Sequence, residues 1–368
     1  MTDHTPTPGD GDPPPAPTTA GRAVARLAIP EPVLEGLEAH GLPVSGTLEA
    51  VEAKLSTQVT SSHAFVDELA RYLIDAGGKR FQPLLVALTG HLGPDAPTAE
   101  HTPEALVDAA TIVELVHLAT LYHDDVIDEA AARRGSPSAN SRWDNTVAIL
   151  TGDYLFARAS ELSADLGVEV TRIMSRTLAR LCEGQIAEVQ GSDGALPPDV
   201  PRLEPTLEHY LQAVSGKTAS LIETSCRYGA LLSGVDPDGV EAAATYGWNV
   251  GMAFQLSDDI LDIASDHEDS GKTPGTDLRE GVRTLPVLYA LDADASGELA
   301  RLLDGDLDDD TELARALELL RGSDALEHAR QHAGTYVAAA VAALEVFGDA
   351  PVVTALTRLA EYAVDRTG

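Results

Sequence analysis

Lysine is the scarcest charged residue in this 368-residue chain. Four lysines stand beside 21 arginines, and 59 acidic residues bring the formal net charge to −34. Such a chain lacks the clustered positive charge that DNA, RNA and anionic lipid surfaces require, which argues against nucleic-acid binding. Three of the four lysines, Lys79, Lys217 and Lys272, directly follow a glycine. Because lysine is otherwise avoided, we expect these compact ammonium groups to serve a specific purpose.

Cysteines and long apolar runs are also few. Cys182 and Cys226 lie far apart and no Cys-x-x-Cys occurs, which argues against a zinc site or a disulfide framework. The first residues show no basic and apolar signal pattern, and no segment is expected to reach the roughly 20 apolar residues of a membrane span. We therefore expect a cytoplasmic protein without a membrane anchor, and at most a transient membrane contact.

The alternation of apolar and polar residues that is typical of strands is nearly absent from the sequence. Apolar residues at helical spacing are widespread instead. Residues 1–20 hold six prolines and predict a disordered tail. Residues 21–368 predict one all-α domain of ten or more helices. The longest expected helices span residues 47–75, 103–129, 168–191, 204–233, 238–265 and 324–347. Loops are expected over residues 130–142, 192–203, 266–283 and 295–310.

Two aspartate clusters share the pattern Asp-Asp-x-x-Asp, one starting at Asp124 and the other at Asp258. On a helix, positions i and i+4 share a face, so Asp124 points with Asp128 and Asp258 with Asp262. Stacked carboxylates repel each other unless a cation bridges them, and Mg²⁺ prefers carboxylates together with substrate phosphate. Each cluster ends an apolar helix, where an unpartnered carboxylate is costly. The pattern therefore predicts a magnesium site rather than a solvated acidic face.

Basic groups near both clusters favour an oligophosphate ligand. Neither Gly-Lys-Thr segment, at 216–218 and 271–273, carries the earlier glycine of a P-loop, which disfavours a nucleotide kinase. Motifs of serine hydrolases, zinc proteases and dinucleotide-binding folds are absent from the sequence.

In content and order, the motifs between about residues 50 and 366 resemble those of the trans-type polyprenyl diphosphate synthases. The matching pieces are Gly77-Gly78-Lys79-Arg80, His117, Asp124 to Asp128, Arg133-Arg134-Gly135, Gly184-Gln185, Lys217-Thr218, Phe254-Gln255, Asp258 to Asp262, Gly271-Lys272, Gly275-Thr276-Asp277-Leu278 and Thr284-Leu285-Pro286. The resemblance implies a helix bundle around a deep central cavity, a homodimer, and Mg²⁺-dependent condensation of isopentenyl diphosphate with an allylic diphosphate.

The resemblance also implies roles for individual residues. Mg²⁺ on the allylic diphosphate would be held by Asp124, Asp125, Asp128 and Asp258, with support from Asp262. The same diphosphate would contact Arg133, Lys217 and Lys272, with Thr218 and Gln255 nearby. Isopentenyl diphosphate would be held by Lys79, Arg80, His117 and Arg134. The expected catalytic group comprises Asp124, Asp125, Asp128, Asp258, Lys217 and Arg133.

Two positions depart from the pattern of many relatives. Gln82 stands where many have arginine, so the isopentenyl diphosphate site would lose a charge there. Val282 stands where many have lysine, although Arg283 follows it directly.

Product length would depend on the helix before Asp124. Ala119 and Thr120 lie four to five positions before this aspartate, and Val116 lies a turn further back. Because no bulky aromatic residue occupies these places, we expect an open path and a polyprenyl diphosphate longer than C15. The resemblance alone suggests that such a product would supply a quinone side chain. Three alternatives stay open: a short-chain farnesyl or geranylgeranyl diphosphate synthase, a weakly active or regulatory subunit, and a class I terpene cyclase.

Overall fold

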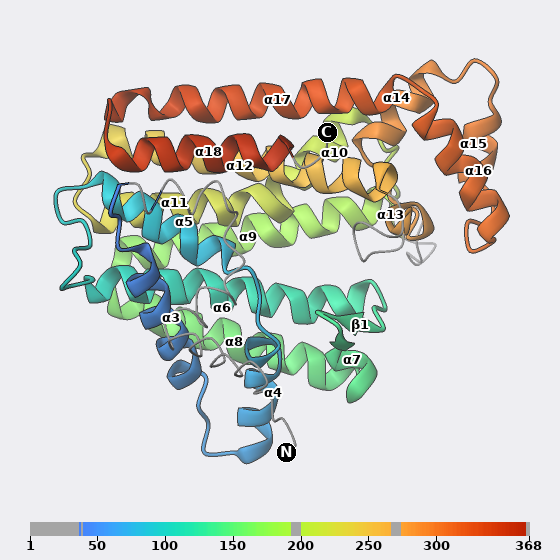
Figure 1. The fold of residues 1–368 in the computed structure, drawn as a ribbon. Coiled ribbons are helices and arrows are strands. Elements are labelled where there is room, and N and C mark those ends of the chain that lie inside the picture. The colour runs from blue at the N-terminus through green and yellow to red at the C-terminus, as the bar shows by residue number, and fades with distance from the viewer. Residues whose placement is uncertain (1–36, 38–39, 193–199, 266–273, 366–368) are drawn as a thin grey trace, which may run out of the picture.

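The computed structural model describes residue 37 and residues 40–192, 200–265 and 274–365. The predicted tail at residues 1–20 and the expected ligand Lys272 lie outside these residues. Within them, the all-α prediction is confirmed (Figure 1). Their only strands are the short β1 (Ala132–Arg133) and β2 (Ser136–Pro137), which pair as an antiparallel hairpin.

The helices follow one another with short connections. In chain order they are α3 (Val44–Gln58), α4 (Ala64–Asp75), α5 (Phe81–Thr89), η1 (Gly90–Leu92), α6 (Glu104–Ile127), α7 (Ala139–Arg142), α8 (Asn145–Asp165), α9 (Val168–Gly191), α10 (Leu207–Val214), η2 (Ser215–Ala219), α11 (Ser220–Leu232), α12 (Pro237–Ala264), α13 (Thr276–Arg279), α14 (Leu285–Ala293), α15 (Glu298–Leu303), α16 (Asp310–Arg321), α17 (Ala325–Ala343), η3 (Leu344–Phe347) and α18 (Pro351–Asp365).

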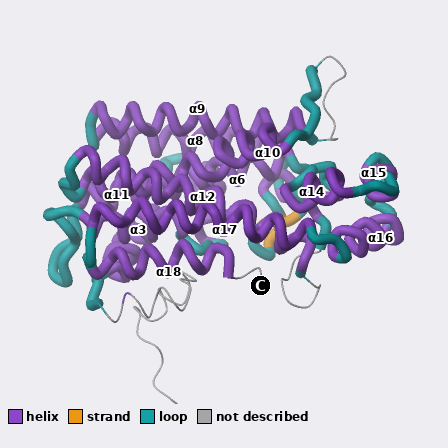
Figure 2. Tube along the Cα trace, turned by 90° about the horizontal axis from the view of Figure 1, so that it is seen from above, coloured by secondary structure: helices purple, strands orange, loops and turns teal. Residues whose placement is uncertain are grey.

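Long, nearly parallel helix axes form the body of the molecule (Figures 1 and 2). On one side, α6 packs against α8, α5 and α11, and its buried apolar side chains dominate the core there. On the other side, α12 packs against α11 and α17, and its apolar residues join a second core with α14 and α16. The carboxyl-terminal ends of α6, α9 and α12 lie at one end of the bundle, beside β1 and α13 (Figure 1).

Helix α6 corrects one expectation from the sequence. By length and composition it could cross a membrane, with a mean hydropathy of 1.5 over its most apolar window. Most of that window is buried inside the bundle, as in the core helix of a globular protein. The helix is apolar on nearly all sides because neighbouring helices surround it.

Some predicted boundaries were also wrong. The helix expected over 47–75 is divided into α3 and α4 around residues 59–63. The loop expected over 130–142 contains the β1–β2 hairpin and α7, and the loops at 266–283 and 295–310 contain α13 and α15. These elements are two to six residues long, which is too short for hydrophobic periodicity to reveal them.

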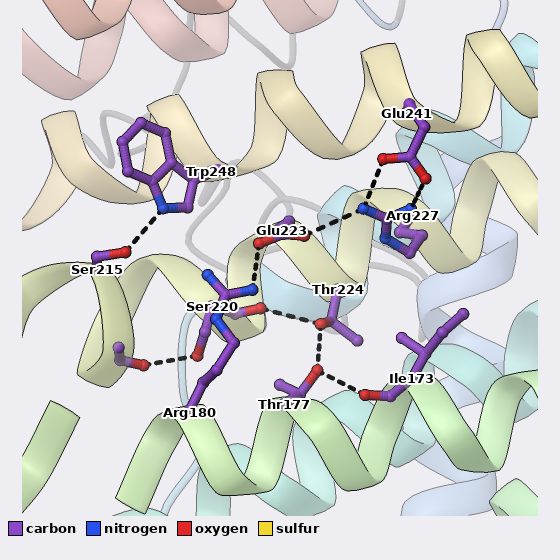
Figure 3. Close-up of polar contacts among 11 residues, drawn as sticks. Ile173, Thr177, Arg180, Ser215, Ser220, Glu223, Thr224, Arg227, Glu241 and Trp248 are labelled. Atoms are coloured by element: carbon purple, nitrogen blue, oxygen red, sulfur yellow. Dashed lines mark hydrogen bonds and ion pairs between the residues drawn. The ribbon is translucent and has the colours of Figure 1, made fainter. Parts of the chain in front are cut away.

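A seam of polar side chains connects α9, α11 and α12 (Figure 3). Glu223 of α11 accepts hydrogen bonds from Arg180 of α9 at 2.5 Å and from Arg227 at 3.2 Å, and Arg227 also pairs with Glu241 of α12. The indole Nε1 of Trp248 on α12 donates to Ser215 Oγ at 3.0 Å, at the start of η2. These contacts fix the η2 turn, which carries Lys217, relative to its neighbours.

Candidate active site at the aspartate-rich end of the bundle

A cavity of about 890 Å³ opens where the ends of α6, α9 and α12 meet η2 and α13. Of the residues expected from the sequence to bind a ligand, Asp128, Lys217, Thr218 and Gln255 line it. Further acidic side chains join them, namely Glu188 of α9, Asp259 of α12, Asp277 of α13 and Glu280 directly after α13. The cavity therefore lies at the aspartate-rich end, as the motifs predict.

The first aspartate cluster lies on the one stripe of α6 that its neighbours leave partly open. His117, Thr120, Leu121 and Asp124 are half-buried and Asp128 is exposed, whereas most other side chains of the helix are buried. The spacing of three and four residues places these five on a single face. Burial raises the pKa of Asp124 to about 6; Asp128 and Glu188 act in the same direction, while Lys217 opposes them.

Asp125 faces away from that stripe, although the sequence suggested it as a metal ligand. Its fully buried carboxylate receives Arg133 Nε at 2.7 Å and a terminal nitrogen of Arg133 at 2.6 Å, both on Oδ1. Within the described residues, its Oδ2 is buried without a hydrogen-bond partner. The structure therefore ties Asp125 to Arg133.

The β1–β2 hairpin sends the two adjacent arginines to different places. Its turn residues Arg134 and Gly135 have φ of 54° and 76°, the signs that a two-residue type I′ turn requires. Arg133 reaches Asp125, whereas Arg134 donates to the carbonyl oxygens of Leu73, at 2.9 Å, and Gly77. Arg80 and Glu129 are the other described non-glycine residues with positive φ, so this strained geometry gathers around the site.

Lys217 lies in η2, a π-helical turn between α10 and α11. Such turns bulge a helix and often occur at functional sites. A Cβ on Gly184 of α9 would lie 2.2 Å from the backbone nitrogen of Lys217, so only glycine allows this close approach. Lys217 Nζ donates to Glu188 Oε1 at 2.5 Å, and its pKa is raised because the charges of Glu188 and Asp124 outweigh burial, the largest single effect.

The second cluster is half-buried near the end of α12. Both oxygens of Asp262 accept backbone N–H groups at the start of α13, from Thr276 and Asp277 at 3.2 Å each. Asp258 is half-buried one turn earlier on the same face. Burial raises the pKa of Asp277, and the neighbouring charges of Asp259 and Asp262 add to this. Negative charge is thus concentrated on both sides of the cavity.

Asp259 belongs to a buried hydrogen-bonded chain instead of facing its neighbour aspartates. Tyr210 of α10 donates its hydroxyl to Asp259 Oδ2, and Gln255 Nε2 donates to Oδ1 at 2.8 Å. Thr218 Oγ1 in turn donates to Gln255 Oε1 at 2.8 Å. Burial raises the pKa of Asp259, while the two hydrogen bonds lower it.

The residues expected to hold isopentenyl diphosphate form a separate group outside the lining of this cavity. A Cβ on Gly78 would lie 2.8 Å from the Arg134 guanidinium, so glycine lets that arginine rest on the turn before Lys79. Lys79 is exposed and His117 half-buried. The pKa of His117 is lowered by burial, and the positive charges of Arg134 and Arg80 act in the same direction.

Arg80 is placed differently from the expectation. Its guanidinium is buried and reaches Glu52 Oε1 at 2.5 Å and Glu114 Oε1 at 2.9 Å. It also donates to the carbonyl oxygen of Ile74 at 3.2 Å. These contacts make Arg80 an internal support for the turn that carries Lys79, rather than a group facing a ligand.

The remaining predicted positions lie as follows. Gln82 is half-buried in the first turn of α5, and Val282 lines the cavity beside Arg283. Val116 and Ala119 are completely buried on α6, whereas Thr120 lies on the partly open stripe. Thr120, one turn before Asp124, is therefore the more accessible position for a product-length determinant.

Sequence reasoning missed Glu188, Tyr210 and Glu280 as members of the site. Glu188 lies one helical turn after Gly184, and Tyr210 two turns before Lys217, so both could be found by helical spacing from the motifs. Burial raises the pKa of Glu280 to about 7, and Asp128 from the first cluster and Asp262 from the second both act in that direction. No sequence signal marks Glu280, because it follows the short α13.

The donor set fits a hard divalent cation that a substrate helps to hold. Among the described residues, no three carboxylate, histidine or cysteine side chains form a ready-made metal cage. The two clusters instead offer oxygen donors in pairs. In the first cluster, burial raises the pKa of Asp124 and of Asp128, and a neighbouring aspartate adds to this in each case. Mg²⁺ usually binds through one or two carboxylates plus phosphate oxygens, which matches this arrangement.

Comparison with known proteins agrees with the all-α fold and shows the family. Residues 63–320 match the family model described as Polyprenyl synthetase. The chain is 41% identical over 349 residues to nonaprenyl diphosphate synthase of Mycobacterium tuberculosis, covering 93% of this chain and all of that one. It is 38% identical over 285 residues to heptaprenyl diphosphate synthase component 2 of Geobacillus stearothermophilus, covering 77% and 84% of the two chains.

A solved structure is similar over nearly the whole chain. The polyprenyl synthase from Caulobacter crescentus, complexed with calcium and isoprenyl diphosphate, superposes with a TM-score of 0.79 at 33% identity. The match covers 92% of this chain and 98% of that one. The chain therefore belongs to the polyprenyl synthetase family.

Proposed function

We propose that this chain, a trans-prenyltransferase, condenses isopentenyl diphosphate with an allylic diphosphate and forms an all-trans polyprenyl diphosphate longer than C15. The relatives named nonaprenyl and heptaprenyl diphosphate synthase support this product class. Mg²⁺ is the proposed metal; the calcium in the similar solved structure supports a divalent cation at such a site.

One observation carries the proposal: both aspartate clusters act on the same cavity. Lys217 interacts electrostatically with Asp124 and Asp128, and Glu280 with Asp128 and Asp262. A cavity with carboxylates on two sides and a lysine between them suits a diphosphate that arrives with divalent cations.

Asp124, Asp128 and Asp258 are the proposed metal ligands, with Asp262 in support. When bound, Mg²⁺ would neutralise the charge that develops on the departing diphosphate. Lys217 adds a positive charge from η2, and Arg133 adds another from the hairpin, where Asp125 orients it. Thr218 and Gln255 offer hydrogen bonds from the cavity wall.

The separate group around Gly78 is the proposed isopentenyl diphosphate site. Lys79 supplies an exposed ammonium, and Arg134 lies against Gly78. His117, with its lowered pKa, is neutral at pH 7 and acts as a hydrogen-bonding group rather than a charge. Arg80 holds this group in place through Glu52 and Glu114.

A homodimer through the outer face of α8 and α9 is part of the proposal. Ile149, Leu150 and Ile186 expose 43%, 61% and 60% of their surface on these two adjacent helices. Exposed apolar side chains on neighbouring helices favour association with a second copy. The relative named component 2 makes a heteromer the alternative outcome, which light scattering of the purified chain would reveal. Leu150→Arg is expected to give monomers.

The cytoplasmic location stays a prediction.

Elongation by the purified chain tests the proposal. With Mg²⁺, labelled isopentenyl diphosphate and allylic primers from C5 to C20, we expect products longer than C15. Cyclic hydrocarbon formed without isopentenyl diphosphate would indicate a terpene cyclase. Failure to extend any primer would point to a regulatory subunit.

A further inference from the structure

Tyr210 makes a contact that the motifs of the proposed reaction do not explain. The residue belongs to α10, two turns before the lysine of η2, and only 8% of its surface is exposed. Its hydroxyl donates to Oδ2 of Asp259, which is itself only 4% exposed. A buried tyrosine needs a partner for its hydroxyl, but a backbone carbonyl would be sufficient. Here the partner is the middle aspartate of the second cluster.

This hydrogen bond determines how the neighbouring amide is oriented. Asp259 Oδ2 receives Tyr210, and Oδ1 receives Gln255 Nε2 at 2.8 Å. The other end of the Gln255 amide accepts the Thr218 hydroxyl at 2.8 Å. An amide has distinct donor and acceptor ends, so these two contacts select one of its two orientations.

The selected orientation has a consequence for the cavity that Gln255 and Thr218 line. Of the two amide hydrogens on Gln255 Nε2, Asp259 takes one, which leaves the second for a ligand oxygen. If Tyr210 lost its hydroxyl, a buried carboxylate oxygen would lose its partner, at a considerable cost in free energy. Asp259 would then turn toward other donors and release the amide.

We infer that Tyr210 is a positioning residue for diphosphate binding, acting through Asp259 on Gln255 and Thr218. The tyrosine lines the cavity, but its hydroxyl is taken up by Asp259, so its effect on the ligand passes through that carboxylate. This inference rests on the proposed function, because it assumes that the diphosphate of the allylic substrate occupies the cavity. It assigns a role to a side chain that the sequence motifs leave out.

The test compares two tyrosine-to-phenylalanine variants. Tyr210→Phe removes only the hydroxyl that reaches Asp259. Tyr246→Phe is the matched control, because Tyr246 is also buried in a helix and donates to a backbone carbonyl, that of Leu356 at 2.7 Å. Calorimetric titration with inorganic diphosphate and MgCl₂ measures binding without turnover. We expect Tyr210→Phe to weaken binding about five- to tenfold, and Tyr246→Phe to leave it unchanged.

Steady-state kinetics provide the second measurement. Tyr210→Phe should raise the KM for the allylic diphosphate by a similar factor and leave the KM for isopentenyl diphosphate unchanged. A purely structural role would lower the melting temperature without this selective change. Equal diphosphate affinities for Tyr210→Phe and Tyr246→Phe would overturn the inference.

Asp259→Asn keeps the test decisive if Tyr210→Phe does not fold. Asparagine keeps the shape of the side chain but offers one acceptor oxygen in place of two, so it cannot serve both Tyr210 and Gln255. We expect the same loss of diphosphate binding, and unchanged affinity would again contradict the inference. If the wild-type chain binds diphosphate but elongates no primer, the proposed function fails while the titrations still decide the role of Tyr210.

Discussion

Arg133 reaches back from the β-hairpin to Asp125, placing two guanidinium nitrogens 2.6 and 2.7 Å from one carboxylate oxygen. Asp125 is fully buried, so its negative charge is directed at Arg133 rather than at the cavity. The middle aspartates of both clusters behave alike, since Asp259 is also occupied by protein partners, Tyr210 and Gln255. The proposed metal ligands are accordingly the outer aspartates Asp124, Asp128 and Asp258, with Asp262, which also accepts two backbone N–H groups, in support.

Asp125→Asn and Asp124→Asn should therefore change different kinetic quantities. Asp125→Asn is expected to raise the KM for the allylic diphosphate several-fold, because Arg133 loses its charged partner, with little change in the Mg²⁺ concentration for half-maximal rate. Asp124→Asn should raise that Mg²⁺ concentration and lower kcat by at least about tenfold. Rates measured across a Mg²⁺ titration test this, and an equal Mg²⁺ shift in both variants would make Asp125 a ligand after all.

Asp124 should also destabilise the metal-free protein. Its pKa of about 6 in the fold lies above the ordinary 3.8, so the folded state binds more protons between these values. The destabilisation is complete above pH 6 and disappears as the pH falls toward 4. We expect Asp124→Asn to raise the melting temperature of metal-free protein at pH 7.5 and to have little effect at pH 4. Asp165→Asn, at an exposed position of α8, is the control and should change neither value.

Gln82→Arg is expected to lower the KM for isopentenyl diphosphate. Gln82 is half-buried one turn beyond Lys79, and an arginine there would add a charged, bidentate donor near the proposed site. The KM for the allylic substrate should not change, since its site is separate. Gln331→Arg, at an exposed position of α17, controls for the added charge. An unchanged or higher KM for isopentenyl diphosphate would place Gln82 outside this site.

Product length should respond to the stripe of α6 that carries Asp124. Thr120→Phe places an aromatic ring one turn before this aspartate, on the partly open face, and should shorten the product. Ala119→Phe should shorten it as well, but because Ala119 is completely buried we also expect a lower melting temperature. Thr120→Val is the matched control, since the Thr120 hydroxyl donates to the His117 carbonyl oxygen within α6 at 2.8 Å. Chromatography of the dephosphorylated products gives their chain lengths. If Thr120→Phe made products as long as those of the wild type, the growing chain would not pass along this face of α6.

Much of the site could be predicted from the sequence because its residues occur in short local patterns. Spacing along a helix was enough to pair Asp124 with Asp128 and Asp258 with Asp262. The scarcity of lysine singled out Lys79 and Lys217, and both lie in the two groups of residues described above. The long helices followed from periodicity, although their ends did not.

Side-chain partners could not be predicted in the same way. Spacing says that Asp125 leaves the face of Asp124, but not that a hairpin returns Arg133 to it. Arg80 was expected to bind the substrate because it is a cation beside Lys79. In the structure, its guanidinium instead pairs with Glu52 and Glu114, which lie on two other helices. Tyr210 and Glu280 belong to the site through tertiary packing, which a linear pattern does not record.

Elongation of a primer by the purified wild-type chain is the decisive measurement for the proposed function. The reaction contains Mg²⁺, labelled isopentenyl diphosphate and a C15 or C20 allylic primer, with Asp124→Asn as the inactive reference. We expect the label to enter all-trans products longer than C15, chelation with EDTA to abolish this, and the variant to show almost no labelled product. Absence of label in prenyl products with every primer, from a folded protein that binds diphosphate, would contradict the proposed function.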